Sequence, residues 1–88
     1  MSFQVIYSGK VLNEDIPFLT SAMAERIVAA IEQKLVFDPI RFGKPLRHAW
    51  KGHRSLRVGD YRIIYRVDPR KNTIYIVTIG HRSGIYEQ

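Results

Sequence analysis

Apolar residues recur at every second position in several stretches of the chain, which is typical of β-strands with one buried face. The first stretch is short and comprises residues 3–7. The others lie in the last third, from Leu56 to Val67 and from Thr73 to Ile79, where arginines occupy several alternate positions. Because Gly59-Asp60 interrupts the longer stretch, the pattern predicts a hairpin followed by a third strand there, and four strands in all.

Between the first strand and the others, apolar residues follow a helical period. Residues 10–19 form the first such segment, and Pro17 is expected to end or kink its helix unless it sits in a first turn. The clearest helix spans residues 21–36, because apolar residues recur there at every fourth position: Met23, Ile27, Ile31 and Leu35. Thr20 or Ser21 offers an N-cap for it, and Asp38-Pro39 is expected to stop it.

The predicted order of elements is β-α-α-β-β-β in a single domain of residues 1–88. Helices set apart from a run of strands predict an α+β fold, in which a helix hairpin packs on a small, mostly antiparallel sheet. Residues 38–53 are expected to form an irregular, basic connector that Leu46 and Trp50 pin to the core.

The strand registers decide where the arginines lie. If Gly59-Asp60 is a two-residue turn, Arg57 faces Arg62 on one side of the sheet. If the turn over residues 68–72 is symmetric, Arg62 faces Thr78 and Arg82 falls on the same side. Like charges directly opposite each other destabilise a sheet, so an anion is expected between them. The same registers predict core-facing side chains at Tyr61, Ile63, Tyr65, Val67, Tyr75, Val77 and Ile79.

The positive net charge of the chain is consistent with an anionic partner. Lysine and arginine number 14 against 8 acidic residues, which gives a formal net charge of +6 and a pI of about 10.0. This balance favours nucleic acid or an acidic protein over a small neutral ligand, although a solvated basic surface gives the same composition.

Other classes of function fit poorly. The chain has no cysteine, which excludes disulfides and thiolate metal ligands and fits a reducing cytosol. No apolar run approaches the roughly 18 residues of a membrane span, and the N-terminus lacks the pattern of a signal peptide. We therefore expect a soluble, cytoplasmic protein without membrane association. There is no phosphate-binding glycine loop, nucleophile elbow or metal-ligand spacing, so neither a cofactor nor a metal is expected.

Several residues near the arginines are candidate site residues. Gly80 either lets a ligand approach the strand closely or simply ends the strand. The adjacent His81 is either a packing group or a proton carrier near neutral pH. Tyr86 either packs the tail or stacks on a base. Further residues extend the candidate phosphate-binding surface or are simply solvated: Lys44, Lys51, His53 and Arg54.

Three segments of the chain together resemble the RelE/ParE superfamily of bacterial toxin–antitoxin toxins, and RelE most of all. They are Pro45-Leu46-Arg47-His48, Leu56-Arg57-Val58-Gly59-Asp60-Tyr61-Arg62-Ile63-Ile64-Tyr65, and Ile79-Gly80-His81-Arg82 with Tyr86. The resemblance covers essentially the whole chain, including its order of elements. It implies a RelE-like fold and a metal-independent endoribonuclease that cuts mRNA on the ribosome. The products would be a 2′,3′-cyclic phosphate and a free 5′-hydroxyl.

The resemblance also implies roles for individual residues. Arg62 and Arg82 correspond to phosphate-stabilising arginines of the family, and Tyr86 to a C-terminal tyrosine that orients or stacks the base. Where RelE has a pair of lysines this chain has His53 and Ser55, and where another branch has a glutamate base it has Lys44. The proton acceptor is therefore assigned to His81 first and to His53 second.

Two other interpretations stay open. Related toxins of the same fold, such as ParE, inhibit DNA gyrase, and a non-catalytic RNA-binding member of the fold is the third possibility. The resemblance further implies a cognate antitoxin, an acidic chain that would add a helix or a strand to this domain.

Overall fold

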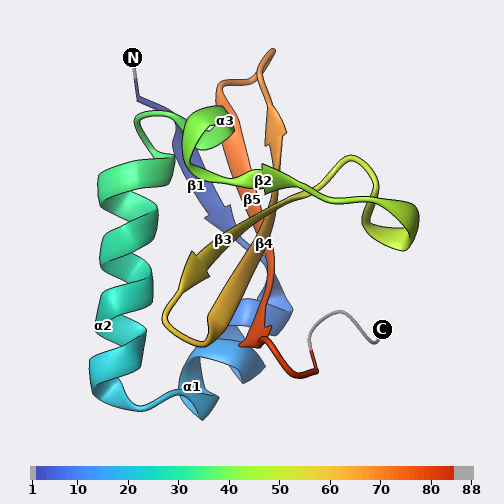
Figure 1. The fold of residues 1–88 in the computed structure, drawn as a ribbon. Helices are drawn as coiled ribbons and strands as arrows, with labels where there is room; N and C mark the ends of the chain where they lie inside the picture. The colour runs from blue at the N-terminus through green and yellow to red at the C-terminus, as the bar shows by residue number, and fades with distance from the viewer. Residues whose placement is uncertain (1, 85–88) are drawn as a thin grey trace.

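The computed structural model describes residues 2–84, which form a five-stranded sheet flanked by helices (Figure 1). β1 runs parallel to β5, whereas the other neighbouring strands are antiparallel, which confirms the predicted α+β fold with a mostly antiparallel sheet. In the spatial order β1-β5-β4-β3-β2, the strands are β1 (Gln4–Tyr7), β5 (Thr73–His81), β4 (Tyr61–Asp68), β3 (Arg54–Val58) and β2 (Lys44–Pro45).

Two helical segments follow β1, as predicted. The first runs from η1 (Val11–Asp15) into α1 (Ile16–Phe18), and the second runs from α2 (Ser21–Ala30) into η2 (Ile31–Leu35). In the part of the chain that the structure describes, no helix is long and apolar enough to cross a membrane.

Local sequence explains where these segments begin and end. Pro17 lies in the last turn of the first segment, which stops at Leu19 because that residue is extended. Thr20 is the predicted N-cap of α2, and its hydroxyl accepts a hydrogen bond from the backbone N–H of Met23 at 3.2 Å.

The connector of residues 38–53 is more regular than predicted. Pro39 opens the short helix α3 (Pro39–Phe42), whose first turn is capped by the Asp38 carboxylate accepting from the Arg41 N–H at 3.0 Å. Proline is favoured at the first position of a helix, so Asp38-Pro39 ends one helix and starts another. The connector then forms β2 and the turn η3 (His48–Trp50). Leu46 and Trp50 are only half-buried and lie outside the core, which corrects the prediction that they pin this segment.

The first hairpin has the predicted register, with Arg57 paired to Arg62 around the Gly59-Asp60 turn. Of the two turn residues only Gly59 has a positive φ, of 60°, which is the pattern of a type II′ turn.

In the second hairpin the predicted register is wrong. Asp68 pairs with Thr73, so the pairing of β4 with β5 is shifted by one residue from the register of a symmetric turn. Val77 is an extra residue that forms a β-bulge, and beyond it the pairing is shifted by two residues. Arg62 therefore pairs with Gly80 instead of Thr78. Side chains alternate between the two faces of a strand, so a shift of two residues leaves Arg62 and its partner on the predicted face. Between the turn and the bulge the shift is one residue, so Ile74 and Ile76 occupy the core in place of Tyr75 and Val77.

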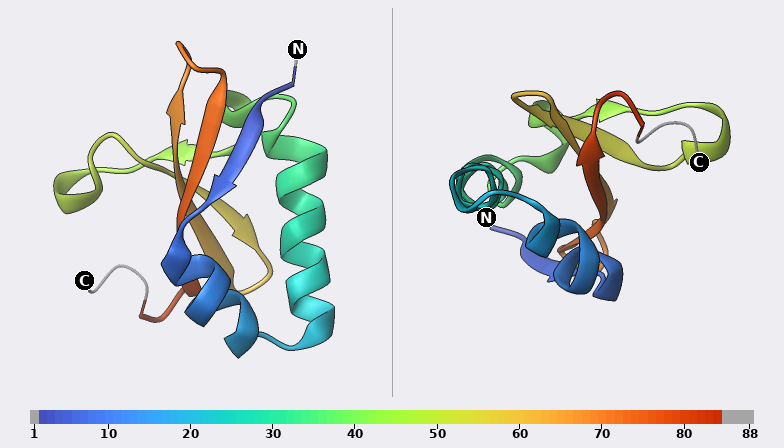
Figure 2. Two further views of the ribbon diagram at one scale, coloured as in Figure 1. Left: turned by 180° about the vertical axis from the view of Figure 1, so that it is seen from behind. Right: turned by 90° about the horizontal axis from the view of Figure 1, so that it is seen from below.

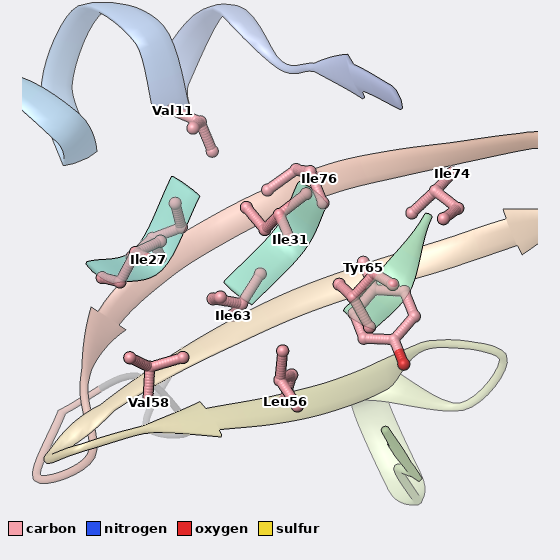
Figure 3. Packing of buried hydrophobic residues seen from close by; sticks show 11 residues of the cluster. Val11, Ile27, Ile31, Leu56, Val58, Ile63, Tyr65, Ile74 and Ile76 are labelled. Carbon is pink, nitrogen blue, oxygen red and sulfur yellow. The ribbon is translucent and has the colours of Figure 1, made fainter. Parts of the chain in front are cut away.

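The core fills the space between the helices and one face of the sheet, as the labelled side chains in Figure 3 show. Burial of each such side chain stabilises the fold by about 1.5–3 kcal/mol. Seen from the front and from below, α2 and the loop after β2 lie on opposite sides of the sheet (Figures 1 and 2). The buried cluster comprises Val11, Ile27, Ile31, Leu35, Leu56, Val58, Ile63, Tyr65, Ile74, Ile76 and Ile79.

Candidate functional site

The face of the sheet that carries Arg57 and Arg62 opens into a hollow of about 460 Å³. β3 and β4 contribute the two arginines, and β2 contributes Lys44 on the other side. The Arg57 Nε donates to the Gly59 carbonyl at 3.0 Å, while Arg62 makes only a long contact of 3.4 Å to the adjacent Tyr61 carbonyl. Neither guanidinium belongs to an ion pair within residues 2–84. Three cations therefore surround one hollow with most of their donors unused.

The hollow also has an apolar wall that the sequence did not predict. Phe42 at the end of α3 lines it together with Pro45 and Leu46, and the Phe42 ring is 40% exposed. The Arg41 guanidinium lies 5.9 Å from the centre of that ring. An exposed aromatic ring beside cations is suited to stacking a nucleobase. The available signal was Phe42 next to Gly43-Lys44-Pro45, but the short helix that presents the ring was not expected.

This wall is fixed to the sheet by Arg54 and Tyr65. The Arg54 guanidinium donates to the carbonyls of Ile40 at 2.6 Å and Gly43 at 2.8 Å, and the Tyr65 hydroxyl donates to the Pro39 carbonyl. Arg54 thus holds the helix end, and it does not line the arginine hollow, although the sequence assigned it to the phosphate surface.

Tyr65 is a buried titratable group in this anchor. Burial raises the pKa of its hydroxyl above the usual value of 10.0, and the hydrogen bond and charge of Arg54 oppose that shift.

Gly43 makes the anchor possible because it has no side chain. A Cβ at this position would lie 1.7 Å from the Tyr65 hydroxyl oxygen, well inside van der Waals contact. Only glycine therefore lets α3 approach β4 closely enough for the hydrogen bond to form.

Arg82 lies at the same end of the sheet, outside the lining of the hollow. Its backbone N–H donates to the Asp60 carbonyl at 2.8 Å, so backbone hydrogen bonding extends one position beyond the last strand pair, Tyr61 and His81. β5 itself ends at His81, so Arg82 is the first residue of the turn that follows the strand. Its Nε lies 3.9 Å from an Asp60 carboxylate oxygen, and both side chains are more than half exposed, so this pairing holds the guanidinium weakly.

His81 lies on the opposite face, which corrects its assignment as proton acceptor. β5 continues through His81, which pairs with Tyr61, and the two rings meet edge-on with centroids 5.5 Å apart. With Tyr61 and Leu19, His81 lines a separate hollow of about 290 Å³ beside α1. Alternation along an unbroken strand carries the ring away from Arg62.

His53 and Lys51 are also absent from the lining of the arginine hollow. His53 packs edge-on against Trp50, with ring centroids 5.3 Å apart, and stands at the opposite end of β3 from Arg57. Lys51 is exposed after η3. The structure thus brings Lys44, Arg57 and Arg62 together around one hollow, and His53 and His81 lie elsewhere. Tyr86 lies outside the described residues.

Chemically, the hollow is suited to a phosphodiester with a base attached. The cations match the charge of a phosphate, and the apolar wall matches a base. Within residues 2–84, no group of three or more histidine, aspartate or glutamate side chains is placed to hold a metal ion.

A small α+β domain with this sheet and an arginine-lined hollow defines a class, the toxins of type II toxin–antitoxin systems. Residues 10–86 match the model of the family described as the ParE toxin of the type II toxin–antitoxin system parDE, and the chain belongs to this family.

Within the class the chain is RelE-like. It is 40% identical over 67 residues to Toxin RelG of Mycobacterium tuberculosis, which covers 72% of this chain and 77% of that protein. It is 36% identical over 72 residues to Toxin RelE of the same organism, with 82% and 74% covered.

Solved structures agree with this placement. One chain in the crystal structure of the toxin–antitoxin complex RelBE2 of Mycobacterium tuberculosis superimposes on this chain with a TM-score of 0.87 at 30% identity. The match covers 93% of this chain and 100% of that chain. The isolated RelE toxin of E. coli has a TM-score of 0.74 at 18% identity, covering 98% and 93%, and this likeness concerns the fold alone. The predicted RelE-like fold is confirmed.

Proposed function

We propose that this toxin is an endoribonuclease that cuts mRNA on the ribosome. The observation that carries the proposal is the cross-strand pair Arg57–Arg62, two like charges that share one hollow with Lys44 and an apolar wall. A surface that only binds a protein has no need for opposed arginines in a concave site, whereas a scissile phosphate gives them a common partner. Kinship with RelE-like toxins supports the same conclusion.

The reaction requires no group beyond the substrate itself as nucleophile. The 2′-oxygen of the ribose attacks the adjacent phosphorus, so that a 2′-O–P bond forms and the P–5′-O bond breaks. The products are a 2′,3′-cyclic phosphate and a 5′-hydroxyl, and one proton moves from the 2′-hydroxyl to an acceptor while another reaches the 5′-oxygen. Arg57 and Arg62 stabilise the charge that builds up on the phosphorane oxygens, and Arg82 joins them from the end of β5.

Proton transfer falls to Lys44 in this scheme. Of the three cations that line the hollow, the guanidiniums do not lose a proton, whereas a lysine amine does so in many active sites. Lys44 replaces His81 and His53 as the first candidate for the acceptor, because neither histidine ring reaches the hollow.

Two cellular effects, translation arrest and a block of replication, distinguish this function from gyrase inhibition. Induction of the wild-type toxin should arrest translation and leave mRNA fragments, while Arg62→Ala and Arg82→Ala should abolish both effects at equal expression. If the toxin instead blocks replication and induces an SOS response with intact mRNA, it is a gyrase inhibitor of the ParE kind. That alternative has the family model in its favour.

A cognate antitoxin is part of the same proposal. The structures with a similar fold include toxins in complex with RelB antitoxins. In this chain β1 lies at the edge of the sheet, with Ile6 48% exposed on it and Leu12 54% exposed in η1. Such an edge can accept a strand or helix from an acidic chain. Co-purification with the product of a neighbouring acidic reading frame tests it.

A further inference from the structure

A second basic groove, of about 350 Å³, runs between α2 and the turn that joins β3 to β4. Three of its lining residues are cations, Arg26 and Lys34 from the helical segment and Arg57 from β3. No acidic residue lines this groove. None of these cations belongs to the ion pairs found within residues 2–84. The groove is therefore a local concentration of positive charge without an internal counterion.

Two of these cations contact the same turn residue, Gly59. The two terminal nitrogens of Arg26 lie 3.6 Å from the position that a Gly59 Cβ would take, and the Arg57 Nε donates to the Gly59 carbonyl at 3.0 Å. Two positive charges at one turn repel each other, so their placement favours a bound anion in the groove.

The charges on the helical segment formed by α2 and η2 are divided between two hollows. Arg26 and Lys34 line the basic groove, whereas Glu25 and Glu32 line a different surface hollow together with Val28. Glu32 lies near enough to Tyr7 that its charge adds to the effect of burial in raising the pKa of that phenol. Since the acids are directed elsewhere, they do not neutralise the groove.

Arg57 lines both this groove and the arginine hollow. Arg57 is therefore shared by two neighbouring surfaces, one with Lys44 and Arg62 and the other with Arg26 and Lys34. This arrangement favours a single extended polyanion over an acidic protein, since one strand can occupy the hollow and the groove together.

We propose that the groove binds the backbone phosphates of the RNA strand next to the scissile bond. The inference rests on the proposed function of the hollow and names a subsite for it. Arg26 and Lys34 are binding residues that contact phosphates and take no part in the chemistry, so they contribute affinity that depends on salt and not on sequence.

The test uses the double substitution Arg26→Gln/Lys34→Gln, with Arg70→Gln/Lys71→Gln as the matched control. Both pairs are exposed, both lower the net charge from +6 to +4 (6 − 2), and the control pair lies on the turn at the opposite end of β4. The probes are a fully 2′-O-methylated single strand of about twelve nucleotides, long enough for an extended site, and a trinucleotide of the same chemistry. The 2′-O-methyl groups prevent cleavage, so binding is measured alone.

The groove variant should bind the long strand about tenfold more weakly than the control at low salt. Its slope of log K against log salt should be smaller by about 1.4, the value for two lost contacts to a single strand. Its affinity for the trinucleotide should equal that of the control.

Three outcomes contradict the proposal in different ways. If the groove variant and the control bind the long strand equally while Arg62→Ala weakens it, the groove is not an RNA subsite although the hollow is. If the wild type binds neither strand, the proposed function fails as well. If the groove variant keeps RNA binding but loses its acidic antitoxin, the groove is a protein-binding surface.

Discussion

Arg57 and Arg62 face each other across β3 and β4, where two positive charges weaken the pairing of the strands. The cross-strand pair is adjacent to Gly80, which has no side chain to fill the space in front of Arg62. A phosphate in the hollow would neutralise both guanidiniums and remove the repulsion. At the scale of the residue, the site is thus built so that an unfavourable pair in the free protein becomes favourable with ligand.

Replacement of Lys44 tests the assignment of the proton acceptor. Lys44→Arg keeps a positive charge in the hollow but replaces an amine that can lose its proton with a guanidinium that does not, so mRNA cleavage on the ribosome should slow by roughly 10²–10⁴-fold with RNA binding retained. Single-turnover cleavage rates and binding of a 2′-O-methylated strand are the two measurements. A variant that cuts at the wild-type rate would show that Lys44 is not the acceptor.

His81→Gln is the matched control for that experiment. Because the His81 ring lies on the Tyr61 side of β5, this variant should cut at the wild-type rate. Slow cleavage by His81→Gln would mean that the end of β5 rearranges when RNA binds.

Phe42 provides the test of the apolar wall. Phe42→Ala should weaken RNA binding by about 1–3 kcal/mol, the usual value of one stacked base, and Phe42→Trp should restore it. Phe37→Ala is the control, because Phe37 is 65% exposed and does not line the hollow. Equal binding by the two alanine variants, measured by fluorescence anisotropy, would remove Phe42 from the site.

At the scale of elements, the hollow exists because α3 and β2 are held at a fixed distance from β3 and β4. Arg54 and Tyr65 provide the hydrogen bonds, and Gly43 provides the room. A side chain that looks like a phosphate ligand in the sequence, Arg54, instead satisfies the carbonyls at the end of a helix, which would otherwise lack partners.

Gly43→Ala should lower the free energy of unfolding by about 1–3 kcal/mol, because the added methyl group overlaps the Tyr65 hydroxyl. Urea denaturation measures the change. Gly9→Ala is the control, since a Cβ at this helical position would lie an ordinary 3.9 Å from the Asn13 side chain. Equal stability of the two variants would show that the anchor adjusts easily.

Alkaline pH should weaken the same anchor. The pKa of Tyr65 is raised by folding, so between the unfolded pKa near 10 and the higher folded value the unfolded chain binds fewer protons than the folded one. The free energy of unfolding therefore falls as pH rises through that window, by up to about 1.4 kcal/mol per pH unit for one group. Below pH 10 Tyr65 contributes no slope.

Tyr65→Phe tests this dependence. At neutral pH it should cost about 0.5–1.5 kcal/mol through the lost hydrogen bond to Pro39, and above pH 10 its stability should fall less steeply than that of the wild type. Chemical denaturation across that range measures both effects. Parallel curves for the two proteins would contradict the raised pKa.

Across the whole molecule, the sequence predicted those helices, turns and strand pairs that depend on residues a few positions apart. The helix over residues 21–36, the Gly59-Asp60 turn and the Arg57–Arg62 pair follow from neighbours a few residues apart. The bulge at Val77 does not, because an inserted residue leaves the local alternation of β5 looking intact.

The candidate site was predictable to the same extent. Arg57 and Arg62 were found through the turn, whereas Phe42 was missed because a four-residue helix gives no periodic signal. His81 does not line the hollow because β5 continues through it, paired with Tyr61, and the sequence alone did not show where this strand ends. Contacts between distant segments decided each of these positions.

Cleavage by purified components shows whether the arginine hollow cuts RNA. Purified toxin is added to ribosomes programmed with a defined mRNA, and the fragment ends are identified chemically. The wild type should form fragments with a 2′,3′-cyclic phosphate and a 5′-hydroxyl, and Arg62→Ala should form them roughly 10²–10³-fold more slowly. Intact mRNA with the wild type, or equal cleavage by a folded Arg62→Ala, would contradict it.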